Sequence, residues 1–150
     1  MIIKAKKEDL KDILELQYIA YQSEAKLFKN TDIPPLKQTL DELCSEFKRG
    51  IILKAINGNH EIIGSVRAYL ENGTAYIGKL MVHPSQQGKG IGTKMLLEVE
   101  KYFPQKRYEL FTSTRSMKNI QMYERLGYKP FKEENISDEL QFIYFEKIDF

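Results

Sequence analysis

The sequence predicts an α/β (α+β) fold with one mixed, mostly antiparallel sheet of about seven strands and helices on both faces. Three strand-like runs joined by tight turns in the middle of the chain predict an antiparallel meander. An apolar strand then passes through a glycine turn into an amphipathic helix and another strand, which predicts one parallel crossover. The length of 150 residues is typical of one domain, and we expect residues 1–150 to form it.

The first third of the chain predicts one strand and two helices. Residues 2–5 are apolar enough for a short edge strand, and residues 7–21 place apolar side chains at helical spacing. Residues 22–35 are polar and contain two consecutive prolines, which cannot continue a helix, so we expect a long loop there. The apolar face that begins at Leu36 predicts a second helix, which ends at Gly50.

Three strands follow, and the turns between them carry strong hairpin signals. The pairs Asn57-Gly58 and Asn72-Gly73 separate the strand-like runs at 51–56, 61–70 and 74–82. Gly78 lies inside the third run, which predicts a bulge or a close backbone approach, with ordinary packing as the alternative.

The last third predicts two helices and three strands. An amphipathic helix follows the glycine turn and ends before Pro104. Residues 113–116 offer N-caps for a short helix that ends at Gly127. The remaining strands are expected at 107–112, 128–131 and 140–148, with 133–139 as a polar connection. The predicted order is therefore β α α β β β α β α β β.

The composition excludes several functional classes. Hydrophobic residues make up 42% and charged residues 29%, a globular profile, and no apolar run approaches the roughly 18 residues of a membrane span. The 23 basic and 21 acidic residues are spread along the chain, which argues against a nucleic-acid surface. Cys44 is the only cysteine, and His60 and His83 have no partner at metal-ligand spacing. We expect a cytoplasmic monomer or homodimer that binds small molecules, without a metal, nucleic acid or membrane.

The glycines at the strand-to-helix join predict an anion site. Gly88, Gly90 and Gly92 are spaced two residues apart, and glycines at a helix start expose unpaired N–H groups. These groups and the helix dipole favour a phosphate at residues 87–93, with a purely structural turn as the alternative. The spacing matches neither the dinucleotide-binding fingerprint nor the nucleotide P-loop.

Two motifs carry a resemblance to a known family. Val82-His83-Pro84 is followed by Gln87-x-x-Gly90-x-Gly92, and residues 123–128 read Tyr-Glu-Arg-Leu-Gly-Tyr. In both motifs and in their order the sequence resembles the GNAT family of N-acetyltransferases. The resemblance implies the acyl-CoA N-acyltransferase fold, and the predicted element order agrees with it.

The resemblance also implies that acetyl-CoA is the cosubstrate. Backbone N–H groups from Gly88 to Thr93 would hold its pyrophosphate, with Gln87 bracing the turn. The backbone of the preceding strand would pair with the pantetheine arm. Many relatives have an asparagine at the position of Ser116, so either Ser116 or Asn119 is a candidate for a further contact. The implied cofactor-binding residues are Leu80, Met81, Val82, Gln87, Gly88, Lys89, Gly90, Ile91, Gly92, Thr93, Ser116, Asn119 and Tyr123.

The catalytic roles follow from the same resemblance. Tyr123 takes the position of the general acid that protonates the leaving thiolate, with packing in the core as the alternative. The backbone N–H groups of Met81 and Val82 would be the oxyanion donors. The third meander strand contains no acid, so Glu71 and Glu24 are the nearest candidates for the base or for acceptor binding, although each also fits a solvated surface acid.

The predicted function is an N-acetyltransferase that moves the acetyl group of acetyl-CoA directly to a primary amine of a small molecule or peptide. The alternatives are a non-catalytic acyl-CoA-binding sensor or interaction module of the same fold and, with less support, a nucleotide-binding regulatory domain. The acceptor is not identified by any motif.

Overall fold

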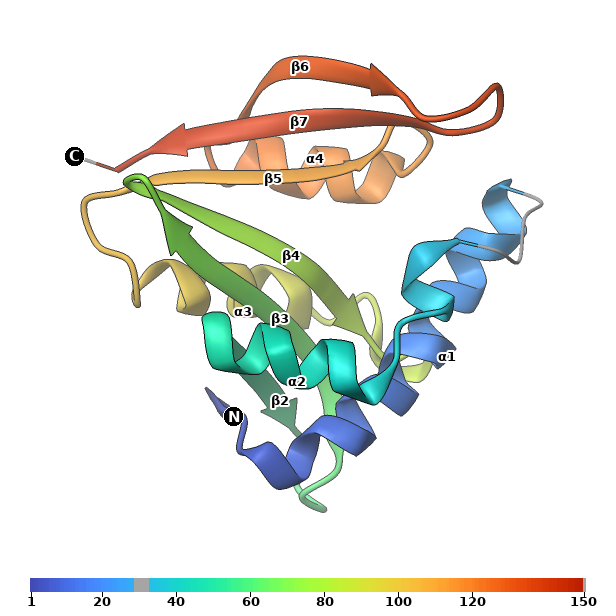
Figure 1. The fold of residues 1–150 in the computed structure, drawn as a ribbon, viewed down its shortest axis with the longest axis vertical. Helices are drawn as coiled ribbons and strands as arrows, with labels where there is room; N and C mark the ends of the chain where they lie inside the picture. The colour runs from blue at the N-terminus through green and yellow to red at the C-terminus, as the bar shows by residue number, and fades with distance from the viewer. Residues whose placement is uncertain (29–32, 150) are drawn as a thin grey trace.

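The computed structural model describes residues 1–28 and 33–149, except for the side chains of Glu24, Leu27 and Phe28. Within this part, the strands form one seven-stranded sheet in the order β1-β2-β3-β4-β5-β7-β6 (Figure 1). The β4–β5 pair is parallel and the other pairs are antiparallel, which confirms the predicted parallel crossover and the antiparallel meander. The strands are β1 (Ile2–Lys4), β2 (Ile51–Ile56), β3 (Ile62–Glu71), β4 (Thr74–Val82), β5 (Arg107–Ser113), β6 (Lys129–Asn135) and β7 (Gln141–Ile148).

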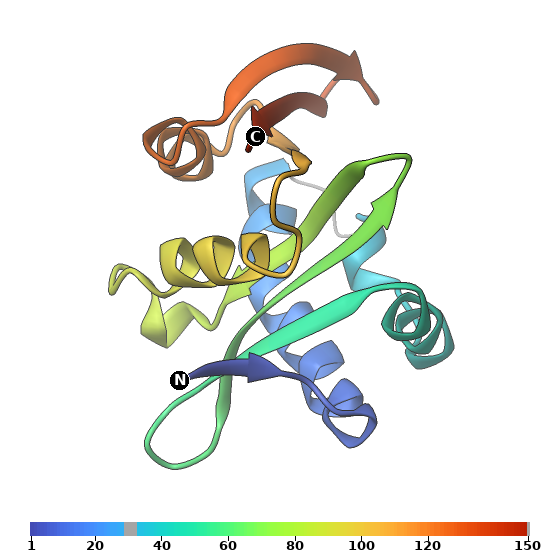
Figure 2. The same ribbon diagram turned by 90° about the vertical axis from the view of Figure 1, so that its left-hand side faces the viewer.

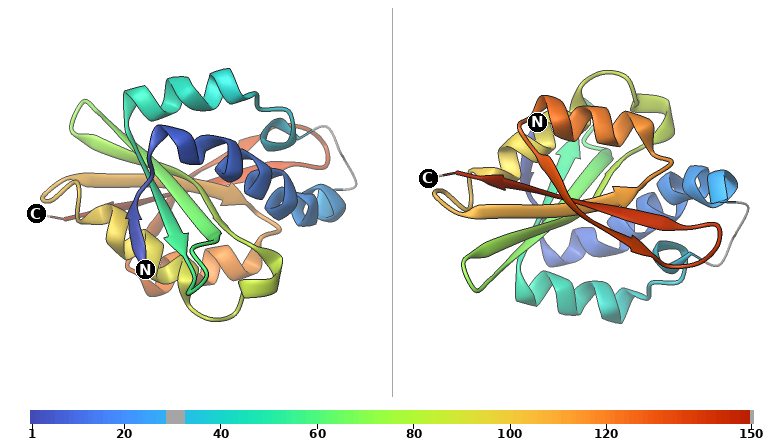
Figure 3. Two further views of the ribbon diagram at one scale, coloured as in Figure 1. Left: turned by 90° about the horizontal axis from the view of Figure 1, so that it is seen from below. Right: turned by 90° about the horizontal axis from the view of Figure 1, so that it is seen from above.

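Helices cover both faces of the sheet. The α-helices are α1 (Leu10–Phe28), α2 (Leu40–Arg49), α3 (Ile91–Glu100) and α4 (Met117–Arg125), and the short 3-10 turns are η1 (Lys7–Asp9), η2 (Pro34–Leu36) and η3 (Pro84–Gln86). Figure 3 shows α1 and α2 on one side and α3 and α4 on the other. β1 and the β6–β7 hairpin lie at opposite ends of the sheet (Figure 2).

The alternation of side chains along β2 explains the two layers. Ile52 packs with Leu10 and Leu43 of the α1 and α2 layer, whereas its neighbour Leu53 packs with Met95 of α3. Successive side chains of a strand point to opposite faces, so both faces of this strand are apolar and each receives helices. Among the described helices, none is long and apolar enough to cross a membrane.

The loop predicted over residues 22–35 is wrong at its start, because α1 continues to Phe28. Tyr21 and Ala25 are one helical turn apart, and Ala25 is buried against Ile33, so the apolar face extends further than the polar composition suggested. Residues 29–32 lie outside the described residues.

The second helix also begins later than predicted. Leu36 belongs to η2, and α2 begins only after Thr39. The Thr39 hydroxyl accepts the Glu42 N–H at 3.2 Å, and the Glu42 carboxylate accepts the Thr39 N–H at 2.9 Å. This capping box fixes the helix start, and it is readable in the sequence as Thr-x-x-Glu.

The strand predicted at 128–131 is longer in the structure, because β6 runs on to Asn135. Every residue of β6 is exposed, since it is the edge strand of the sheet. An exposed edge strand carries charged residues and proline rather than an alternating pattern, which is why residues 133–135 resembled a connection. The connection itself is residues 136–140.

Strand β4 leaves its neighbour β5 partway along its length. The pairing begins at Thr74–Arg107 and ends at Tyr76–Glu109, although β4 continues to Val82. The two strands diverge beyond that point (Figure 1). The second half of β4 therefore presents an edge that β5 does not cover.

A β-bulge interrupts β4 at the place where the strands diverge. Arg67 lies opposite Gly78, and Ser65 lies opposite Met81, so two residues of β4 share one residue of β3. Lys79 takes a φ of 51°, which is uncommon for a residue other than glycine. The bulge predicted at Gly78 is found directly after it, and the lysine takes the left-handed conformation.

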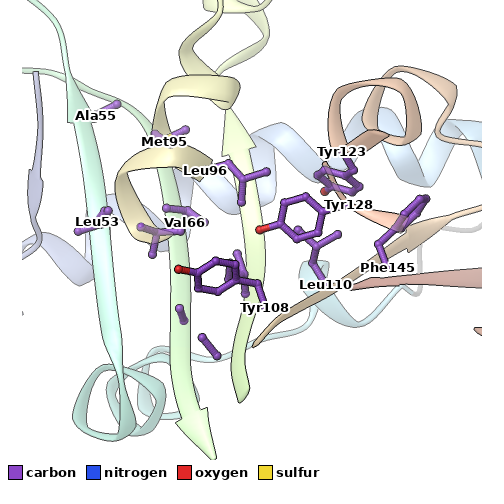
Figure 4. Packing of buried hydrophobic residues seen from close by; sticks show 14 residues of the cluster. Leu53, Ala55, Val66, Met95, Leu96, Tyr108, Leu110, Tyr123, Tyr128 and Phe145 are labelled. Atoms are coloured by element: carbon purple, nitrogen blue, oxygen red, sulfur yellow. The ribbon is translucent and has the colours of Figure 1, made fainter. Parts of the chain in front are cut away.

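The core on the α3 and α4 side holds Tyr123 in place (Figure 4). The ring centroid of Tyr123 lies 6.1 Å from that of Tyr128 and 5.6 Å from that of Phe145. The Tyr128 hydroxyl donates to Glu100 at 2.7 Å, and Lys147 pairs with the same carboxylate at 3.0 Å. Burial and the Glu100 carboxylate raise the pKa of Tyr128, so its hydroxyl stays protonated.

Candidate functional site

The glycine turn forms a cradle of unpaired N–H groups. Gly88 and Gly90 have φ of 79° and 80°, a left-handed conformation that glycine adopts without strain. Helix α3 begins with the hydrogen bond from Lys94 N–H to the Gly90 carbonyl. No described residue accepts a hydrogen bond from the N–H groups of residues 88–93. These groups at a helix start suit an anion such as phosphate.

A pocket of about 440 Å³ opens over this cradle and the end of β4. Of the thirteen cofactor-binding residues that the sequence implied, the structure brings ten together on its lining: Leu80, Met81, Val82, Gln87, Gly88, Gly90, Ile91, Gly92, Thr93 and Asn119. The Gln87 side chain donates to the Val82 carbonyl at 3.2 Å, which ties the glycine turn to the strand.

The other three implied residues lie elsewhere. Lys89 does not line the pocket, and its ammonium donates to Gln86 at 3.1 Å. Ser116 is the N-cap of α4 and also lies off the lining, whereas Asn119 faces the pocket and donates to Thr112 at 3.3 Å. Tyr123 lines a separate passage. Of the two polar candidates on α4, the geometry favours Asn119.

Sequence reasoning missed the wall that the pocket takes from α1 and the two cations that α4 adds to it. Ala20, Tyr21 and Ser23 come from the second half of α1, which includes part of the segment that was predicted as a loop. Lys118 and Arg125 of α4 add two cations to the lining. These two residues are seven positions apart, which places them on one helix face, but only the packing shows that this face meets the pocket.

The open edge of β4 presents alternate N–H groups. His83 N–H donates to the Ile63 carbonyl of β3 at 2.8 Å. Alternate residues of a strand point their N–H groups to the same side, so the Met81 N–H points to β3 and the Val82 N–H to the open edge. Leu80 directly precedes Met81, lies in the bulge and lines both the cradle pocket and the space between the diverging strands. The sequence could not show which of the two N–H groups, Met81 or Val82, faces the open edge, because the pairing of β4 with β3 determines the direction of each N–H.

A narrow passage of about 50 Å³ runs between the diverging strands. It shares Tyr21, Leu80 and Asn119 with the cradle pocket, and Tyr123 lines it. Tyr123 is 5% exposed, so its ring packs in the core while its edge borders the passage. The two alternatives for this residue, core packing and a role at the site, are therefore compatible.

A second pocket, of about 370 Å³, lies at the other end of the passage. The two spaces share lining residues on β4 and β5, namely Ile77, Gly78, Lys79, Leu110 and Phe111. Its further walls come from α2, β3 and β7 through Glu46, Arg49, Arg67, Tyr69 and Tyr144, with Tyr76 and Glu109 on the strands. The site thus consists of two larger pockets, and the small space between β4 and β5 shares wall residues with each of them. We call the second one the acceptor-side pocket.

A buried polar network supports one wall of the acceptor-side pocket. Arg67 is 6% exposed and donates to Glu46 at 2.7 Å, to Gln38 at 3.0 Å and to Gln17. Gln17 in turn donates to the Pro35 carbonyl at 2.8 Å. Burial lowers the pKa of Arg67, and the Glu46 carboxylate opposes that shift. The network fixes α1, η2 and α2 against β3.

The acids proposed from the sequence are not on the described walls. Glu71 is the exposed last residue of β3, opposite Thr74 at the end of β4 that is far from Val82, and it lines neither pocket. Glu24 lies on α1, and its side chain is outside the described part of the structure. The acids on the lining are Glu46 and Glu109, which sequence reasoning missed because only the fold brings α2 and β5 to the same pocket.

Both histidines have structural roles in turns. His83 Nδ1 accepts the Ser85 N–H at 3.1 Å and caps η3, and His60 takes a φ of 62° in the β2–β3 turn. Within the described residues, there is no group of three or more His, Cys, Asp and Glu side chains that could hold a metal ion.

Solved structures share this fold over almost the whole chain. The PaiA N-acetyltransferase from Thermoplasma acidophilum, solved with coenzyme A, has a TM-score of 0.77 at 19% identity, covering 99% of this chain and 98% of that one. The ribosomal-protein-S18-alanine N-acetyltransferase from Escherichia coli gives 0.78 at 15% identity, with 100% and 94% covered. A phosphinothricin acetyltransferase from Sinorhizobium meliloti, solved with AcCoA, gives 0.76 at 15% identity, with 99% and 87% covered.

The sequence itself gives a family match. No curated protein sequence matches the chain. A sequence profile of the acetyltransferase (GNAT) family matches residues 8–128, which include both motifs, the cradle and Tyr123. The resemblance found from the two motifs is thereby confirmed, and the protein belongs to the GNAT acetyltransferase family.

Proposed function

We propose that the protein is an N-acetyltransferase that moves the acetyl group of acetyl-CoA directly to a primary amine of a small molecule or peptide. The observation that carries this proposal is the passage between β4 and β5, which shares wall residues with both the cradle pocket and the acceptor-side pocket and is bordered by Tyr123. A donor and an acceptor held in the two pockets would meet there, so no covalent intermediate on Cys44 is needed.

The residues of the cradle pocket fit coenzyme A. The unpaired N–H groups of residues 88–93 would hold the pyrophosphate, and Lys118 and Arg125 would add positive charge. The open edge of β4 would pair with the pantetheine arm as an added strand. Acetyl-CoA supplies an acetyl group already activated as a thioester.

The order of groups along β4 suggests which N–H acts where. Val82 lies next to the cradle, so its N–H would bond the pantetheine arm. Leu80 is further from the cradle and borders the passage, so its N–H would stabilise the negative charge that develops on the acetyl oxygen. The Tyr123 hydroxyl would give its proton to the departing thiolate.

The acceptor amine must lose a proton, and we propose Glu109 as the residue that takes it. Both oxygens of Glu46 are engaged, Oε2 by Arg67 at 2.7 Å and Oε1 by Gln38 at 3.0 Å. Glu109 uses Oε1 for Arg107 at 2.8 Å, and no described group donates to its Oε2. Glu109 also lines the acceptor-side pocket, so it can meet an amine there directly or through water.

Release of free thiol from acetyl-CoA, measured against a broad panel of amines, tests this function. We expect release that depends on both acetyl-CoA and one class of amine. Calorimetry with acetyl-CoA serves as the companion measurement. Binding without thiol release for any amine would contradict an enzyme and favour the acyl-CoA sensor, and displacement of acetyl-CoA by NAD or ATP at comparable affinity would favour a nucleotide-binding domain.

A further inference from the structure

We propose that the acceptor is a small amino acid or a similar primary amine that carries a carboxylate, and that Arg49 recognises this carboxylate. The inference rests on the N-acetyltransferase function proposed above and names the substrate class of the same site. The volume of about 370 Å³ in the acceptor-side pocket suits a small molecule.

The balance of charge on the lining favours an anionic group on the acceptor. Among the described residues, the lining contains the carboxylates of Glu46 and Glu109. Each is already paired, Glu46 with Arg67 at 2.7 Å and Glu109 with Arg107 at 2.8 Å. The positive charge of Arg49 on the same lining is therefore not neutralised by either of these carboxylates.

Arg49 is the cation available to a ligand. Its guanidinium lies over the Tyr69 ring, 4.1 Å from the ring centroid, and no carboxylate of the described residues lies within ion-pair distance of it. Stacking on an aromatic face orients a guanidinium while leaving its N–H donors free for a carboxylate. In the same wall, the buried Arg67 Nε has no acceptor among the described residues. On this side of the pocket, Arg49 and Arg67 therefore provide N–H donors that a ligand carboxylate could accept from.

The acceptor-side pocket has a positive charge, Arg49, on its β3 side and a negative charge, Glu109, on its β5 side. Tyr69 stacks on Tyr76 with ring centroids 5.2 Å apart, and Tyr76 lies opposite Glu109 in the β4–β5 register. Arg49 and Glu109 are therefore separated by two strand spacings, on the order of 10 Å across the sheet. An acceptor with an ammonium group toward Glu109 and a carboxylate toward Arg49 matches this polarity. Phe111, 46% exposed on the lining, offers an apolar surface to its side chain.

Matched acceptors test the proposal. The probes are the natural amino acids, each with its amide and its decarboxylated amine, assayed by thiol release at equal concentrations of the unprotonated amine. We expect at least one amino acid to exceed its amide and its decarboxylated amine about tenfold in kcat/KM. Arg49→Gln should reduce that preference about tenfold, mainly by raising the KM of the amino acid. Lys48→Gln is the matched control, because Lys48 is an exposed cation of α2 that does not line the pocket.

The outcomes separate this inference from the proposed function. Turnover confined to amides, decarboxylated amines or other acceptors without a carboxylate would overturn the inference and leave the acetyltransferase intact. An amino-acid preference that Arg49→Gln and Lys48→Gln change equally would also overturn the role of Arg49. Absence of thiol release with every amine, with acetyl-CoA bound, would instead overturn the proposed function and the inference with it.

Discussion

The cradle pocket draws most of its groups from one continuous stretch, residues 80–93, whereas the acceptor-side pocket draws side chains from α2, β3, β4, β5 and β7. The cradle also works mainly through backbone N–H groups, which a glycine spacing in the sequence can reveal. The acceptor-side groups are ordinary Glu, Arg and Tyr residues in elements far apart in the chain. This difference explains why the sequence could predict a class of ligand for the cradle pocket but none for the acceptor-side pocket.

The same difference predicts how substitutions behave on the two sides. Changes to the cradle should weaken acetyl-CoA binding whatever the acceptor is, and changes to the acceptor-side pocket should affect some acceptors and leave acetyl-CoA binding intact. Tyr123 lies at the passage between them and should affect the chemical step instead.

The largest effect is expected from Tyr123→Phe, because it removes a proton donor from the passage. We expect kcat to fall by about 100-fold or more, the usual range for loss of a general acid, with little change in the KM for acetyl-CoA. Tyr128→Phe is the matched control. The Tyr128 hydroxyl donates to Glu100, and Tyr128 does not line the passage. Removing this hydroxyl should lower the free energy of unfolding by about 1–3 kcal/mol and leave kcat unchanged. Equal kcat for the Tyr123 variant and the wild type would contradict the role of Tyr123 as a general acid and leave it only a role in core packing.

The next effect is expected from Gly90→Ala, which tests the cradle. Alanine is strained at a φ of 80°, so the turn should shift and its N–H groups should lose their alignment. We expect the affinity for coenzyme A to fall about 10- to 100-fold by calorimetry, or about 1.4–2.8 kcal/mol.

Gly73→Ala separates this loss of affinity from strain. Gly73 has a φ of 79° in the β3–β4 turn, and a Cβ there meets nothing within 4 Å, as at Gly90. Both variants should therefore lose similar stability. If the Gly90→Ala and Gly73→Ala variants also bind coenzyme A equally well, the prediction of an anion site at residues 88–93 is wrong.

The fold was predictable wherever local signals and burial agree. The element order, the meander and the parallel β4–β5 pair follow from turn residues and from runs with a clear period. The errors fall where tertiary contacts override composition. Ala25 extends α1 because it packs on Ile33, and β6 extends through charged residues because an edge strand needs no apolar face.

The site was predictable mainly in its backbone part. The Gln87-x-x-Gly90-x-Gly92 spacing predicted the cradle, and the second motif led to Ser116 and Asn119 as candidates, of which Asn119 lines the pocket. By contrast, Glu109 reaches the acceptor-side pocket only through the β4–β5 register, and Arg49 only through the placement of α2. Such residues have no local signature, because spatial proximity rather than spacing along the chain defines them.

A smaller effect is expected from Glu109→Gln on the acceptor side. Loss of the carboxylate should lower kcat/KM for the acceptor about tenfold. This is less than the usual effect of removing a general base, because water can partly replace Glu109 as the proton acceptor. The dissociation constant of acetyl-CoA should stay the same, because Glu109 does not line the cradle pocket. Glu8→Gln, which removes an exposed acid far from both pockets, controls for net charge. A change in acetyl-CoA affinity without a change in turnover would contradict the division between the two pockets.

The smallest effect is expected from Asp9→Asn. Asp9 lines neither pocket, so this substitution tests whether a loss of stability alone can lower activity or coenzyme A affinity. Burial would raise the pKa of Asp9, but the hydrogen bonds from Lys54 and the Lys6 N–H outweigh it and hold the pKa below 3.8. A lowered pKa stabilises the folded state above pH 3.8, and this contribution disappears as the pH falls through the folded-state value.

We therefore expect Asp9→Asn to cost about 0.5–1 kcal/mol at neutral pH and progressively less as the pH falls below 3.8, by thermal unfolding over this pH range. Asp12→Asn, at an exposed acid in the first turn of the adjacent helix α1, should show no such pH-dependent difference. Neither variant should change kcat or the affinity for coenzyme A at neutral pH, because a loss this small leaves the folded population almost complete. A kinetic defect in Asp9→Asn would mean that the two pockets depend on the overall stability of the fold, and the site variants would then need comparison at equal stability.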